Sequence, residues 1–187
     1  MDAARAKKPA SYEDLLSLPE NVVGEIVDGE LYSSPRPASA HAAATSALGE
    51  ELGPPFKRGR GGPGGWFILD EPELHIGGQV MVPDLAGWRR ERMPIMPDVP
   101  FFEMAPDWLC EVSSPSTAVL DRRRKLPHYA RAGVRHLWII DPVARMLEVY
   151  RSDGEHWLLL GTHSGDEKIR AVPFDAIELD LSVLWAR

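Results

Sequence analysis

The sequence predicts one α/β (α+β) domain, a mixed central sheet flanked by helices. Residues 107–141 follow the order strand, helix, strand, which is typical of a right-handed crossover between parallel neighbours. Asp-Gly pairs at 28–29 and 153–154 stand between apolar runs and predict antiparallel hairpins. A hydrophobic content of 44% over 187 residues is enough for one core.

The first half of the chain alternates short helices with strands. Residues 1–11 are expected to be loose, which leaves 12–187 as the single domain. Ser11 is a good N-cap and Pro19 a helix stop, so a short helix is expected between them. The remaining expected elements are strands at 23–27 and 30–34, a helix at 39–52, a basic glycine-rich loop at 57–65, a strand at 66–76 bent at Pro72, and a strand at 79–88.

The second half contains the crossover and a hairpin. Gly133 is expected to end the crossover helix, because glycine readily takes the left-handed conformation after a last helical turn. The expected elements are an irregular proline-rich segment at 89–106, a strand at 107–114, a turn at 114–117, a helix at 121–132, a strand at 134–142, a hairpin at 146–160, and a tail with a short strand and a helical turn.

Composition excludes several classes of protein. No apolar run approaches the roughly 20 residues of a membrane helix, and the charged first residues lack the apolar segment of a signal peptide. The single cysteine, Cys110, excludes an internal disulfide framework and fits a cytoplasmic location. The net charge of -7 argues mildly against nucleic acid, but basic clusters at 57–60 and 122–125 matter more than the total.

Two carboxylates interrupt apolar rows. Asp84 follows Val80 and Val82 in strand alternation, and Glu111 follows Leu109. Buried like charges repel and resist ionisation, and a divalent cation between them removes that cost. Oxygen ligands without cysteine favour Mg²⁺ or Mn²⁺ over zinc.

A structural role remains the alternative for each acid. Pro-Asp is a common turn pair, and Glu111 would also suit a pairing with an arginine at a sheet edge. The basic helix start at 122–125 favours a site. In a strand–loop–helix unit the helix returns to the carboxyl edge of the strand, where ligands bind.

Four segments carry a resemblance to a known family. They are VPDLAGW, WLCEVSSPST, DRRRKLPHYARAGVRHLWIIDP and the earlier GEIVDGELYSSPRPASAH. From about Tyr12 to Leu184 the chain resembles the Uma2 family (DUF820), a bacterial branch of the PD-(D/E)XK nuclease superfamily. The resemblance implies a restriction-endonuclease-like core and a metal-dependent nuclease.

The resemblance also implies roles for particular residues. Asp84 and Glu111 match the carboxylates that hold the metal, and Glu25 matches an N-terminal acid that adds a metal or water ligand. The superfamily lysine usually stands two residues after the glutamate, where this chain has Ser113. In this branch Lys125, on the following helix, matches that lysine.

Other matched or nearby residues have less defined roles. His41 matches a recurring family histidine, and Ser113 is a candidate accessory group. Arg122, Arg123 and Arg124 are candidates to hold the nucleic-acid backbone, against an equal expectation of a solvated helix face.

The expected activity is Mg²⁺- or Mn²⁺-dependent endonucleolytic hydrolysis of phosphodiester bonds in DNA. The alternatives are a catalytically inactive binding or assembly module with the same fold, and a hydrolase of small phosphate esters. An enzyme that cuts both strands often works as a pair, and Phe101 and Phe102 are expected to be exposed and to supply a homodimer interface.

Overall fold

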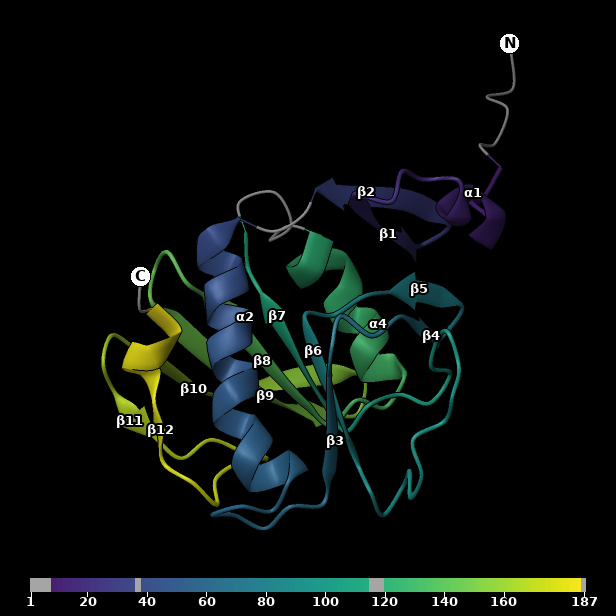
Figure 1. Ribbon diagram of the computed structural model, residues 1–187. Coiled ribbons are helices and arrows are strands. Elements are labelled where there is room, and N and C mark those ends of the chain that lie inside the picture. Colours follow the sequence, from purple (N-terminus) through teal and green to yellow (C-terminus); the bar gives the residue numbers. More distant parts are fainter. Residues whose placement is uncertain (1–7, 36–37, 115–119, 186–187) are drawn as a thin grey trace.

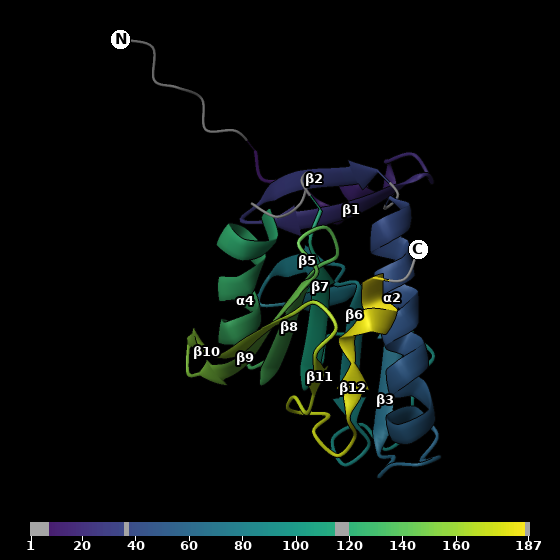
Figure 2. The same cartoon turned by 90° about the vertical axis from the view of Figure 1, so that its left-hand side faces the viewer.

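A mixed six-stranded sheet forms the centre of the protein, covered by helix α2 (Ser39–Leu52) on one face and α4 (Leu126–Arg131) on the other (Figures 1 and 2). The computed structural model describes residues 8–35, 38–114 and 120–185. Most of the N-terminal segment expected to be loose, and residues 115–117 of the expected turn, lie outside these ranges. The predicted fold class is confirmed.

The central sheet has the strand order β10-β9-β8-β7-β6-β3. Strands β7 and β8 are parallel, and their other neighbours pair antiparallel, so the predicted crossover is confirmed. The strand bounds are β3 Trp66–Asp70, β6 Leu85–Arg89, β7 Trp108–Val112, β8 His136–Asp141, β9 Met146–Asp153 and β10 His156–Ser164.

A second sheet lies across one end of the first (Figure 1), in the order β2-β1-β5-β4. Its hairpin turns at Asp28 and Gly29, which both have positive φ, as the Asp-Gly signal predicts. The bounds are β1 Val22–Val27, β2 Glu30–Pro35, β4 Leu74–Ile76 and β5 Gln79–Met81.

The strands expected at 66–76 and 79–88 are each divided between the two sheets. The first ends at Asp70, and Glu71, which has φ 45°, and Pro72 follow. The second breaks at Pro83 and Asp84. The Glu71 N–H donates to the Asp84 carbonyl at 3.0 Å, so the two breaks lie side by side. Asp84 therefore stands between strands, and the prediction that it continues a strand face was wrong.

The helices follow their sequence signals. Helix α1 (Tyr12–Leu16) begins with a capping box between Ser11 and Asp14. Two wide π-helical turns, η1 (Gly53–Lys57) and η2 (Asp121–Lys125), adjoin α2 and α4, and each contains or precedes a proline. The tail forms β11 (Lys168–Ile169), β12 (Leu179–Asp180) and the 3₁₀ turn η3 (Leu181–Trp185).

Alternation along β7 divides the core into two clusters. Trp108, Cys110 and Val112 face the cluster beneath α2 and the C-terminal tail. Leu109 faces the cluster beneath α4, which includes Tyr129. Glu111 has the same parity as Leu109, so its carboxylate belongs to the α4 side of the sheet.

The irregular segment 89–106 packs against the domain. Phe101 stacks on His75 with ring centroids 3.7 Å apart, and Phe102 lies against Trp88 at 4.7 Å. Both phenylalanines are half-buried, so the expectation that they are exposed was wrong. Within the described ranges, no helix has the length and apolarity to cross a membrane.

Candidate active site

Lys125 is the centre of a buried cluster of charges. Its side chain is 2% exposed, and Nζ lies 2.8 Å from Glu25 Oε1 and 2.9 Å from Glu111 Oε1. Asp121 Oδ1 lies 3.4 Å away on the same wide turn. Burial alone would lower the pKa of Lys125, but the negative charges of Glu111 and Glu25 outweigh it and raise this pKa well above its usual value. Lys125 therefore stays charged.

The wide turn η2 helps to carry Lys125 to this position. The Leu126 N–H donates to the Asp121 carbonyl, five residues back, instead of closing an ordinary α-helical turn. Pro127 has no N–H to give to the preceding turn, which favours such a widening. The predicted proximity of Lys125 and Glu111 is thus present in the structure.

Glu25 reaches the cluster from β1. Its Oε1 also accepts a hydrogen bond from the Val82 N–H at 2.8 Å. The side chain is buried, and its neighbour Ile26 pairs with Val80 across β1 and β5. The small sheet therefore brings the N-terminal acid against the segment that leads to Asp84.

Glu111 has a second buried partner, Tyr129, which sequence reasoning missed. The Tyr129 hydroxyl donates to Glu111 Oε1 at 2.7 Å. Burial raises the pKa of the Glu111 carboxyl well above its usual value, and the charges of Asp121 and Asp84 add to the rise, whereas Lys125 opposes it. Several carboxylates thus share one lysine.

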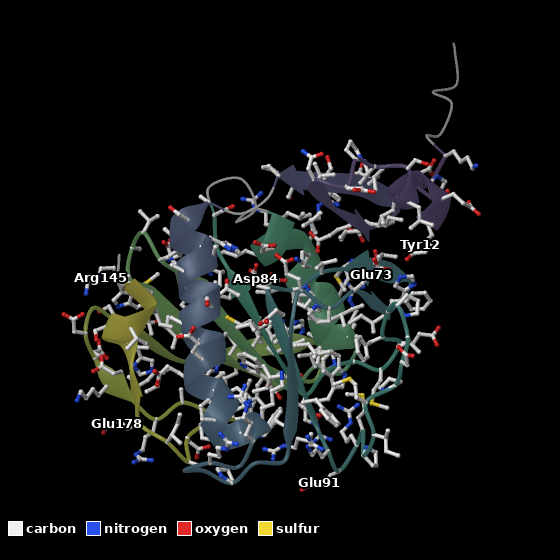
Figure 3. The ribbon with its side chains drawn as sticks, in the orientation of Figure 1. Tyr12, Glu73, Asp84, Glu91, Arg145 and Glu178 are labelled. Carbon is white, nitrogen blue, oxygen red and sulfur yellow. The ribbon has the colours of Figure 1, made fainter. Side chains whose placement is uncertain are left out.

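Asp84 lies beside the end of β7, near the edge where the two sheets meet (Figure 3). Its Oδ2 accepts a hydrogen bond from the Val112 N–H at 2.6 Å. Its Oδ1 lies 3.0 Å from His41 Nε2. The charge of Asp84 contributes to the raised pKa of Glu111, which places the two carboxylates within electrostatic range.

His41 connects this cluster to the surface. Burial lowers its pKa, but the hydrogen bond and charge of Asp84 outweigh burial, so the pKa is raised overall. Its Nδ1 is buried and has no hydrogen-bond partner among the described residues. The same holds for the hydroxyl of Ser113, which stands two residues after Glu111.

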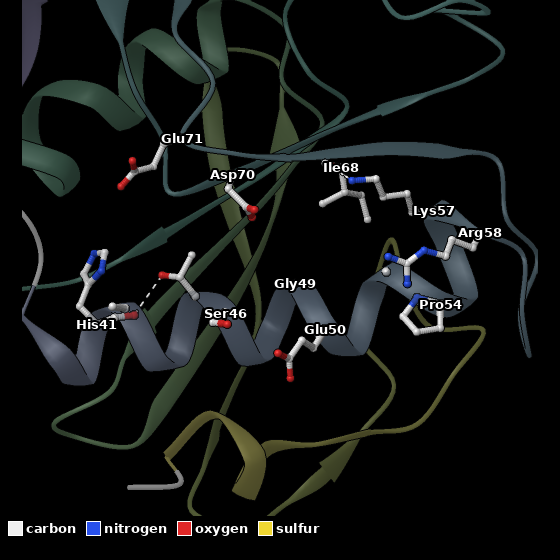
Figure 4. Close-up of a pocket in the computed structure, with 13 residues that line it drawn as sticks. His41, Ser46, Gly49, Glu50, Pro54, Lys57, Arg58, Ile68, Asp70 and Glu71 are labelled. Atoms are coloured by element: carbon white, nitrogen blue, oxygen red, sulfur yellow. Dashed lines mark hydrogen bonds between the residues drawn. The ribbon is translucent and has the colours of Figure 1, made fainter.

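A pocket of about 640 Å³ opens beside His41 and follows α2. His41 lies at one end, and Arg58 and Pro54 at the other (Figure 4). Asp70 and Glu71 face the helix across the pocket (Figure 4). The pocket therefore leads from the carboxylate cluster toward the basic loop at 57–65.

The basic helix start is partly engaged within the protein. Arg122 forms an ion pair with Glu148 at 2.5 Å, and Arg124 with Asp28 at 3.2 Å. Arg123 is exposed, and no ion pair is found for it in the described ranges. Two of the three arginines predicted to hold nucleic acid thus also join η2 to other elements.

The donor set fits a hard cation that keeps water or substrate ligands. Within the ranges described, no three His, Cys, Asp or Glu side chains are grouped as an all-protein metal site would need. Mg²⁺ in proteins is commonly bound by one or two carboxylates, with waters and substrate phosphates filling the remaining positions. Asp84 and Glu111 supply such a pair of carboxylates.

A comparison with protein families decides the relationship. The Uma2 family model, described as "Putative restriction endonuclease", matches residues 9–183. The chain belongs to the Uma2 family. The resemblance inferred from VPDLAGW, WLCEVSSPST and the following helix is therefore confirmed.

A solved structure supports the same fold for this Uma2 chain. It is the crystal structure of "a putative nuclease belonging to DUF820" from Anabaena variabilis ATCC 29413. The match has a TM-score of 0.74 and 24% identity, and covers 95% of this chain and 98% of that one. At this identity the match carries the fold alone. No curated protein matches the chain.

Proposed function

We propose that this Uma2 protein is a metal-dependent endonuclease that hydrolyses phosphodiester bonds of DNA. The observation that carries the proposal is the contact of Lys125 Nζ with both Glu25 and Glu111. Asp84 accepts a hydrogen bond from the residue after Glu111, so it lies alongside this contact. A buried cation among carboxylates, in a family described as endonucleases, is the chemistry that phosphoryl hydrolysis requires.

Asp84 and Glu111 would hold Mg²⁺ or Mn²⁺. When bound, the cation would neutralise charge on a phosphate oxygen and lower the pKa of a bound water. Asp84 is held in position by Val112 and His41, and Glu111 by Tyr129 and Lys125. Fixed carboxylates of this kind need little reorganisation when a ligand arrives.

Lys125 would act as a positive charge near the reacting phosphate. A lysine accepts a proton at neutral pH only if its pKa is depressed, and here the carboxylates raise the pKa of Lys125. We therefore assign it stabilisation of developing negative charge. Glu25, whose Oε1 also accepts from Val82, would orient a water or extend the metal ligands.

His41 would position Asp84. Its Nε2 lies 3.0 Å from one carboxylate oxygen while the Val112 N–H binds the other, so the carboxylate is fixed from both sides. His41 also lines the α2 pocket, which gives it access to a strand lying there.

A substrate panel tests the activity. Purified protein would be offered labelled single- and double-stranded DNA and RNA with Mg²⁺ or Mn²⁺, beside Asp84→Asn, Glu111→Gln and Lys125→Met. Glu167→Gln, at an exposed turn, is a control that removes one charge outside the cluster. We expect DNA cleavage that the control retains and the three site variants lose.

A catalytically inactive binding module is the second candidate. The observation that favours it is Ser113, a small hydroxyl at the usual lysine position, together with the complete pairing of Lys125 by carboxylates. DNA binding without cleavage of any member of the panel would select this candidate.

A further inference from the structure

Five arginines gather at the end of the central sheet opposite the candidate active site. We define the arginine edge as Arg89, Arg90, Arg92, Arg135 and Arg151. Asp84 precedes β6 and Arg89 ends it, so the two lie at opposite ends of that strand. Five residues of strand correspond to about 17 Å. Figure 3 shows nitrogen-tipped side chains near Glu91, at the far end of the sheet from Asp84.

Strand register brings these arginines together from different parts of the sequence. Arg89 pairs with Trp66 across β6 and β3. Arg151 pairs with His136 across β9 and β8, and His136 pairs in turn with Trp108 on β7. Arg135 precedes His136 directly. The edge therefore follows one end of several neighbouring strands.

Among the described residues, Asp107 is the acidic side chain that forms ion pairs with these arginines. Asp107 is buried beneath the edge, with Oδ1 3.0 Å from Arg92 and 4.0 Å from Arg135. Within residues 89–92, Glu91 is the single acid among three arginines. No ion pair is found for Arg89, Arg90 or Arg151 in the part of the chain that the structure describes. The chain as a whole has a net charge of -7, so the positive charge of this edge is opposite in sign to that of the protein.

Two of the guanidinium groups are held in place by aromatic rings. Arg89 lies 4.5 Å from the Trp66 ring centroid, and Arg90 lies 4.0 Å from that of Phe67. Stacking orders these side chains in advance and leaves N–H donors at their margins. Less conformational entropy is then lost when an anion binds.

The lowered pKa of His136 reflects the positive charge of this edge. Burial lowers its pKa first, and the positive charges of Arg89, Arg151 and Arg135 lower it further. Three arginines from three segments thus act on one imidazole at the centre of the edge.

We propose that the arginine edge binds the phosphodiester backbone of a nucleic acid, outside the segment at the candidate active site. Guanidinium groups suit phosphate, and unpaired clusters of them are the usual footprint of backbone binding. The α2 pocket leads from His41 to Arg58, and Gly65 at the end of the same loop accepts from the Arg90 N–H at 2.9 Å. A strand in that pocket would therefore approach the edge. The choice of nucleic acid rests on the proposed function.

The test measures binding without cleavage. Fluorescence anisotropy with a labelled duplex of about 30 base pairs would be followed in EDTA between about 50 and 200 mM salt. The test variant is Arg90→Gln/Arg151→Gln, at two exposed positions, and the control is Arg145→Gln/Lys168→Gln, which removes the same charge from exposed ion pairs elsewhere. Thermal melting would verify that both variants fold.

We expect the test variant to bind on the order of tenfold more weakly, with a salt slope smaller by about two, while the control matches the wild type. Equal affinity and slope in the test variant and the wild type would overturn the proposal. So would binding of anionic phospholipid vesicles, through the same arginines, as tight as binding of the duplex.

The same titration separates this proposal from the proposed function. Duplex binding is measured in EDTA and cleavage with Mg²⁺, so each proposal can fail while the other stands. Arginine-dependent binding by a protein that cleaves nothing would leave the edge in place and reject the nuclease. If the protein cleaves DNA but its binding does not depend on these arginines, the nuclease proposal stands and the arginine-edge proposal is rejected.

Discussion

Lys125 Nζ and Glu111 Oε1 form a buried ion pair of 2.9 Å between the turn η2 and strand β7. The resemblance to the PD-(D/E)XK superfamily implies a lysine two residues after the glutamate on the same strand, where this chain has Ser113. The wide turn that follows the strand carries Lys125 to Glu111 instead. This contact links the fold to the proposed chemistry, because the crossover that joins β7 to β8 also carries the lysine.

Removing the ammonium should strongly destabilise the fold. Lys125→Met leaves Glu25 and Glu111 buried without their shared cation, and an uncompensated buried charge costs about 3–5 kcal/mol. Urea unfolding at neutral pH would measure the change. Lys168→Met, which removes an exposed pair with Asp180, should cost much less. Equal losses for the two variants would contradict the account.

The Tyr129 hydroxyl should contribute to both stability and activity. Tyr129→Phe removes the 2.7 Å hydrogen bond to Glu111 in a buried setting, for an expected cost of about 1–3 kcal/mol. Tyr12→Phe is the matched control, because Tyr12 donates to Glu73 at the same distance in a partly exposed site. A larger loss for Tyr12→Phe than for Tyr129→Phe would show that burial of the Glu111 pair is unimportant.

Asp28 should make stability depend on pH in the acid range. A hydrogen bond from His128 lowers the pKa of Asp28, and Arg124 adds to the effect. Because this pKa lies below the unfolded value of about 3.9, the charged carboxylate stabilises the fold above about pH 4. That contribution is lost as the pH falls through the folded pKa. Since Asp28 is 42% exposed, the contribution should not exceed about 1 kcal/mol.

Asp28→Asn isolates this effect, because asparagine also tolerates the left-handed turn at this position. Thermal melts should separate the variant from the wild type at pH 7, and the difference should be smaller at pH 3. Asp98→Asn, at an exposed loop, should follow the wild type at both values. If the difference in melting temperature between Asp28→Asn and the wild type were larger at pH 3 than at pH 7, the charged Asp28 carboxylate would not be the stabilising form.

Much of the fold could be predicted because its signals are local. Asp28 and Gly29 fix a hairpin whatever surrounds them, and the apolar strands around α4 indicate a parallel crossover. The division of the strands near Glu71 and Asp84 could not be predicted. Pro72 and Pro83 mark the two breaks, but the change of sheet depends on pairing between distant segments.

In the candidate site, too, some contacts could be predicted from the sequence and others could not. The meeting of Glu111 with Lys125 follows from the crossover geometry, which residue patterns and family resemblance both indicated. Tyr129 and Asp121 were missed, although each stands four residues from Lys125 and therefore on the same side of a helix. Their spacing was the available signal. The contact of His41 with Asp84 joins two distant segments and has no local signature.

The decisive experiment concerns metal-dependent cleavage of DNA at Glu111. It compares the cleavage of labelled DNA by the wild type and by Glu111→Gln, with Mg²⁺ and with EDTA. We expect metal-dependent cleavage by the wild type and a loss of at least about 100-fold in the variant, whose side chain keeps its size but lacks the charge. Cleavage by Glu111→Gln at the wild-type rate, or wild-type cleavage that persists in EDTA, would contradict it.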